Sequence, residues 1–140
     1  MASKFTNRLI TVSLVSCVVA LPLTALAAEA VDIEAATTLA ADTKFKIELA
    51  AKCGTPIASH TNLRLERFAV ALDLGSKGLG PQKLSKADFE TVMTVVSTPE
   101  NTTAIAKRAA EAAATSSGCQ QPDNIKYWNF LREAGPILGT

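Results

Sequence analysis

The sequence predicts a small all-α domain, a bundle of about four to five helices stapled by one disulfide. Three observations support this: apolar residues recur at helical spacing in most segments, capping residues and Gly or Pro separate these segments, and an even pair of cysteines follows a leader-like N-terminus. The 140 residues suffice for one domain with its own core. They are too few for a (β/α)8 barrel, which needs about 250 residues.

The N-terminus has the pattern of a secretory signal. Lys4 and Arg8 precede an uncharged apolar stretch at 9–28, and small residues at 25–27 form an Ala-Leu-Ala cleavage motif. The pattern therefore predicts a signal peptide at 1–27.

A signal peptide predicts that the mature protein lies outside the cytoplasm. Cleavage near Ala28 would leave a helical domain at 28–140, periplasmic or secreted and without a stable membrane span. Two alternatives stay open. Cys17 resembles the lipidated cysteine of a bacterial lipoprotein signal, and the apolar stretch is long enough to remain as an uncleaved anchor.

The two remaining cysteines, Cys53 and Cys119, predict a disulfide, because an even pair in an exported protein most simply forms one bridge. A redox-active pair would have the C-x-x-C spacing, which is absent. Two cysteines and one histidine do not make a zinc set, so we expect no metal.

The charge balance argues against nucleic acid as a partner. Lys and Arg number 14 against 13 Asp and Glu, and no basic stripe is present to neutralise phosphates. Loss of the leader would remove two of the basic residues and keep the net charge close to zero.

The first expected helix spans 30–51. Asp32 is placed to cap it, and Gly54 and Pro56 form a stop signal after it. The alternation of charged and apolar residues at 44–49 is typical of a strand, but the helix-forming residues continue beyond it.

A second helix is expected from the cap candidate Asn62 to Gly75. Its predicted core stripe has helical spacing and consists of Leu65, Phe68, Ala69 and Leu72. An alternating strand over the same segment is the alternative. The glycine-rich segment 75–81 follows and is interpreted as a plain loop, since its spacing matches no phosphate-binding pattern.

Capping signals introduce the next two helices. Ser85 and Asp88 have the spacing of a capping box, ahead of a core stripe of Phe89, Val92, Met93 and Val96. Thr98, followed by Pro99 and Glu100, starts a helix to about residue 114 whose core face consists of Ile105, Ala109 and Ala112 or Ala113.

The last helix is expected from Pro122 to about Ala134, stopped by Gly135 and Pro136. It carries half of the aromatic residues of the mature chain. We interpret these residues as the candidate partner-binding patch, because Trp and Tyr are frequent at interface hot spots: Tyr127, Trp128 and Phe130. The alternative is that the domain buries both faces of this helix.

No catalytic motif is present, so the sequence predicts a non-enzymatic binding domain without a cofactor or metal, of the inhibitor, immunity or chaperone type, whose partner is another envelope or extracellular protein. One alternative is a small-molecule or lipid carrier. Its cavity would lie between Phe68 on one side and the helix that carries Phe89 and Met93 on the other. Another is a small hydrolase that uses His60, the single histidine.

Overall fold

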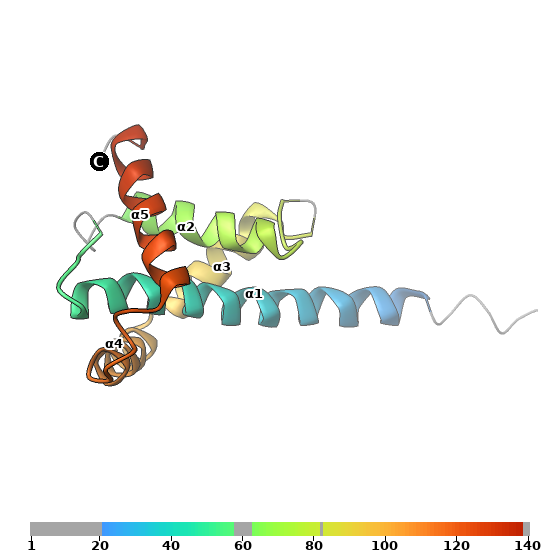
Figure 1. Cartoon of the computed structure of the whole chain (residues 1–140). Coiled ribbons are helices and arrows are strands. Elements are labelled where there is room, and N and C mark those ends of the chain that lie inside the picture. The colour runs from blue at the N-terminus through green and yellow to red at the C-terminus, as the bar shows by residue number, and fades with distance from the viewer. Residues whose placement is uncertain (1–20, 58–62, 82, 139–140) are drawn as a thin grey trace, which may run out of the picture.

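The computed structural model describes residues 21–57, 63–81 and 83–138, with side chains from residue 33 onward (Figure 1). Within these ranges the chain forms five helices and no strand, which confirms the predicted all-α class. The helices are α1 (Leu21–Lys52), α2 (Leu63–Ser76), α3 (Lys86–Val96), α4 (Pro99–Ala113) and α5 (Pro122–Ile137).

The long helix α1 is the axis of the domain and packs against each of the other four helices. In Figure 1, α2 and α3 lie on one side of α1 and α4 lies on the opposite side, while α5 begins beside α1 and rises steeply past α2. The N-terminal part of α1 extends beyond the other helices.

The predicted start of the first helix, with Asp32 as its cap, is wrong, because α1 begins at Leu21 and passes through this position. Between Pro22 and Lys52 the sequence contains no Pro or Gly and is rich in Ala and Leu, the best helix formers, so nothing ends the helix before residue 32. The predicted cleavage motif at 25–27 therefore lies within α1 when residues 1–27 are present.

Residues 1–20, which contain Lys4, Arg8 and Cys17, lie outside the described residues. Within the described part of the chain, no helix combines the length and the apolarity that a bilayer crossing requires.

Two of the predicted N-terminal caps, Ser85 and Thr98, are confirmed, whereas the cap candidate Asn62 lies outside the described residues. The Ser85 side chain accepts from the backbone N–H of Asp88, and the Asp88 carboxylate accepts from the backbone N–H of Ser85, which completes the capping box of α3. Thr98 caps α4 by accepting from the backbone N–H of Asn101, and Pro99 occupies the first turn. These contacts satisfy N–H groups that a helix start leaves without partners.

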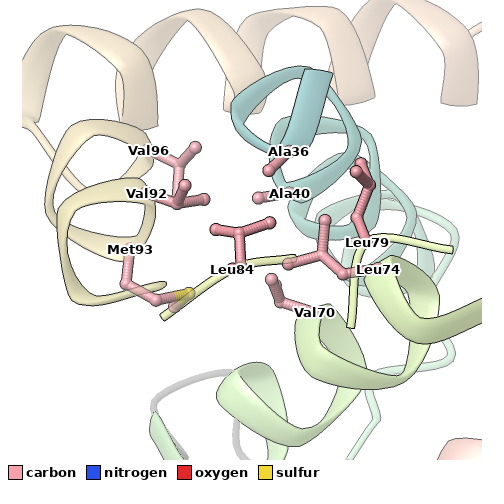
Figure 2. Packing of buried hydrophobic residues seen from close by; sticks show 9 residues of the cluster. All are labelled: Ala36, Ala40, Val70, Leu74, Leu79, Leu84, Val92, Met93 and Val96. Atoms are coloured by element: carbon pink, nitrogen blue, oxygen red, sulfur yellow. The ribbon is translucent and has the colours of Figure 1, made fainter. Parts of the chain in front are cut away.

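The first of two buried clusters joins α1, α2, α3 and the turn between α2 and α3. Figure 2 shows Val70 and Leu74 of α2 and Leu84 of the turn directed toward Ala36 and Ala40 of α1 and toward the valines of α3. The small alanines let these larger side chains approach the α1 backbone. The predicted core residues Val92, Met93 and Val96 all belong to this cluster, and Phe89 packs against it.

The second cluster joins the C-terminal half of α1 with α2, α4 and α5. It includes Trp128 and Leu131 of α5, and its other members are Ile47, Leu49, Ala50, Ile57, Leu65, Ala69 and Ala109. The predicted disulfide is confirmed beside this cluster. It joins Cys53, directly after α1, to Cys119, between α4 and α5, and so ties the start of the last helix to the end of the first.

The predicted core stripe of α2 is wrong at Leu72, which is 41% exposed. The buried residues of α2 are Leu65, Ala69, Val70 and Leu74. This face is rotated from the predicted one because α2 contributes to both clusters at once, Leu65 and Ala69 to the second and Val70 and Leu74 to the first.

The predicted end of the last helix at Ala134 is also wrong, because α5 continues through Gly135 and Pro136 to Ile137. A proline near the C-terminal end removes only one backbone hydrogen bond, and the backbone N–H of Leu138 still bonds to the carbonyl of Ala134. The stop signal therefore acts one turn later than its position indicates.

Candidate functional site

The structure places the three aromatic residues of the predicted binding patch in three different environments. Trp128 is 3% exposed, and its indole Nε1 donates to the carbonyl of Lys46 at 2.9 Å. Tyr127 is partly buried, whereas Phe130 is 45% exposed. Of the three, Phe130 is the one that a partner can reach without opening the core.

Tyr127 belongs to a polar network that joins three helices. Its hydroxyl donates to Asp73 Oδ2 of α2 at 2.9 Å, and the buried Thr43 hydroxyl of α1 donates to the same oxygen at 2.6 Å. The Lys46 ammonium lies 4.9 Å from the centre of the Tyr127 ring, a cation–π distance. The network thus fixes one carboxylate between α1, α2 and α5.

Burial, the negative charge of Asp73 and the hydrogen bond to Asp73 raise the pKa of Tyr127 far above its ordinary value of 10.0. The hydroxyl therefore keeps its proton throughout the physiological range and acts as a donor. Its role in the network is to hold the Asp73 carboxylate.

Thr43, Lys46 and Asp73 of this network line a depression of about 470 Å³ between α1, α2, α4 and α5, which we call the polar hollow, and Tyr127 lies behind this lining. Its charged and amide-bearing lining residues are Asp42, Lys46, Asp73, Lys77, Arg108 and Asn124. Leu39 and Phe45 of α1 give it an apolar part. The volume lies in the range typical of small-molecule sites.

Arg108 is held at the edge of the polar hollow. Its guanidinium carbon lies 4.8 Å from the centre of the Phe45 ring, and its Nη2 lies 3.9 Å from Asp42 Oδ1. The ion pair is long and exposed, so it contributes little stability and leaves the guanidinium able to contact another anion.

A second depression, of about 270 Å³, lies between α2 and the C-terminal half of α5, and we call it the apolar hollow. It is lined by Phe68, Phe130, Glu133, Ala134, Ile137 and Leu138. Ile137 is 86% exposed, and Glu133 is the one charged residue of this lining.

The depression that Phe89 lines does not include Met93 or Phe68, the other residues named for a carrier cavity. Met93 is buried in the first cluster, and Phe68 packs against the second. Phe89 instead lines a depression of about 280 Å³ together with Leu74, Leu79 and other residues of α2 and the following turn.

His60, the residue on which a hydrolase was predicted to depend, lies outside the described residues. Within the described ranges, no three His, Cys, Asp or Glu side chains are grouped so that they could hold a metal ion.

The predicted loop at 75–81 includes Lys77, which lines the polar hollow.

Sequence reasoning missed the polar hollow, although it contains polar signals. Thr43 lies on the helix face that carries the buried alanines of α1, and Asp73 lies next to the buried Leu74 in an otherwise apolar stretch. Polar residues at such positions need hydrogen-bond partners, which is the signal that could have indicated a network.

Comparisons of the chain with models of protein families, with curated proteins and with solved structures found no match.

Proposed function

We propose that the protein is an exported, non-enzymatic domain that binds another envelope or extracellular protein through the apolar hollow. The observation that carries the proposal is the exposure of Phe130 and Ile137 beside a depression lined mainly by apolar side chains. Export is supported by the leader-like pattern of 1–27 and by the Cys53–Cys119 disulfide, a bond typical of oxidising compartments.

The shape of the hollow favours a particular partner segment. Phe130 projects from α5 and Phe68 from α2, so an apolar side chain inserted between the two helices would contact an aromatic ring from each. The single charge of the lining, that of Glu133, favours a Lys or Arg next to the inserted residue. The proposed partner therefore presents an apolar helix or turn flanked by a basic residue.

Site-specific photocrosslinking in the envelope of the native host tests the proposal. A photoreactive phenylalanine analogue replaces Phe130 in one variant and Val95 in the other. Val95 is a matched control because it is also a large apolar residue, 40% exposed, but lies on α3. We expect a crosslinked protein from position 130 and none from position 95, with the crosslink mapped to an apolar segment beside Lys or Arg.

Three outcomes would overturn the proposal. The same products from both positions would indicate nonspecific capture, and the absence of products at position 130 would show that the hollow has no protein partner. A crosslink between two copies of this chain would assign the apolar hollow to self-association.

A further inference from the structure

We propose that the polar hollow binds a small zwitterion, a free α-amino acid with an apolar side chain. This inference goes beyond the proposed protein binding, because it concerns a different depression and a different chemistry. It rests on a carboxylate with one oxygen directed by two hydroxyl groups, on an excess of cations around it, and on an apolar wall.

The carboxylate of Asp73 supplies the site for the ligand ammonium. Thr43 and Tyr127 both donate to Oδ2, whereas no side chain or backbone group of the described residues donates to Oδ1. Because Tyr127 keeps its proton, its hydroxyl donates to the Asp73 carboxylate and holds it in place. A protonated tyrosine carries no negative charge, so Tyr127 does not compete with Asp73 for the ligand ammonium. Oδ1 can then accept from an ammonium group of the ligand.

The cations of the hollow supply the site for the ligand carboxylate. Lys46, Lys77 and Arg108 line the hollow together with two acids, Asp42 and Asp73, so the lining carries one excess positive charge. Lys46 and Lys77 form no ion pair with an acid of the described residues. A ligand with one positive and one negative end is therefore paired at both ends, whereas a simple anion would face Asp73 and a simple cation would face the lysines.

The apolar wall of the hollow determines which side chain the bound amino acid carries. Leu39 and Phe45 lie on α1, beside Asp42, Thr43 and Lys46, so a ligand paired with the charged groups also reaches these two residues. An aliphatic side chain such as that of leucine gains contact there. A charged side chain directed at these two apolar residues would lose hydration there without gaining a hydrogen-bond partner.

Titration of the protein with L-leucine tests this inference. Backbone amide shifts in NMR spectra are recorded at each leucine concentration to detect binding. We expect saturable shifts of Thr43, Asp73 and Lys77 at concentrations up to the order of 10 mM. N-acetyl-leucine, which lacks the ammonium, and leucinamide, which lacks the carboxylate, should each bind about tenfold more weakly, since each loses a charge-assisted hydrogen bond.

A pair of variants locates the site. Asp73→Asn keeps an oxygen that accepts from Thr43 and Tyr127 but removes the charge, and it should weaken leucine binding about tenfold. Lys83→Gln is the control, because Lys83 is exposed and does not line the hollow, and it should bind as the wild type does.

Absence of shifts at the highest leucine concentration would overturn the inference. Equal binding of leucine and N-acetyl-leucine would also overturn it, as would unchanged binding by the Asp73→Asn variant. The two ligand analogues test the same point without a substitution, so the result does not depend on the stability of the variant. None of these outcomes bears on the crosslinking at Phe130.

Discussion

Alkaline pH should destabilise the protein through Tyr127. The native state keeps this tyrosine protonated because burial and the adjacent Asp73 raise its pKa, whereas the unfolded chain releases the proton near pH 10. Above pH 10 the unfolded state therefore binds fewer protons than the native state, and the free energy of unfolding falls as pH rises. A difference of one proton contributes about 1.4 kcal/mol per pH unit, so between pH 9 and pH 11 the expected loss is about 1.4 kcal/mol.

The chain is well suited to this measurement because Tyr127 is its single tyrosine. Absorbance of the phenolate near 295 nm then reports this residue alone. We expect no phenolate in the native protein up to about pH 11 and a midpoint near pH 10 in concentrated urea. Urea unfolding at several pH values, compared with the Tyr127→Phe variant, gives the corresponding stability.

The Tyr127→Phe comparison removes the contributions of the lysines, which also titrate in this range. At pH 7 the variant should be less stable by about 1.5–3 kcal/mol, the value of a hydrogen bond to a charged acceptor, and this difference should shrink between pH 9 and pH 11. A native phenolate midpoint near pH 10 would refute the reasoning, as would a difference between the two proteins that does not change with pH.

Two further predictions concern the connection between α4 and α5. Gly118→Ala would place a Cβ 1.8 Å from the carbonyl oxygen of Ala112, so the turn must shift. We expect the free energy of unfolding, measured in urea, to fall by about 1–3 kcal/mol. Gly75→Ala is the control, because the space around its Cβ is open, and it should lose no stability. Replacement of Cys53 and Cys119 by serine opens a link across 66 residues and should cost about 4 kcal/mol, measured the same way; an unchanged midpoint would show that packing alone holds α5.

The helix starts that could be predicted are those set by neighbouring residues. The capping box of Ser85 and Asp88 and the Thr98–Pro99 start of α4 depend on contacts within one turn, and both are present as the sequence indicates. The beginning of α1 could not be found in this way, because Asp32 has the chemistry of a cap but the chain before it is equally good helix.

The buried face of α1 was missed because its residues carry little hydrophobic signal. Along α1 a row of buried positions recurs at steps of three and four, occupied by Ala36, Ala40, Thr43, Ile47 and Ala50, and Leu49 is buried beside the end of this row. Three of these are alanine and one is polar, so a search for large apolar residues finds no stripe. Their small size is nevertheless what allows other helices to pack closely around this axis.

Thr43 and Asp73 each carry the signal of a buried polar group, but the sequence could not show that they meet in one hollow, because its parts are distant in sequence. Thr43 and Asp73 are 30 residues apart and Asp73 and Tyr127 are 54 apart, so the packing of α2 and α5 against α1 creates their contact. The aromatic content of α5 indicated a helix with a role in binding or packing, but its three aromatic residues have three different roles. Trp128 fills the core and Tyr127 holds a carboxylate, which leaves Phe130 as the part of the predicted patch open to a partner.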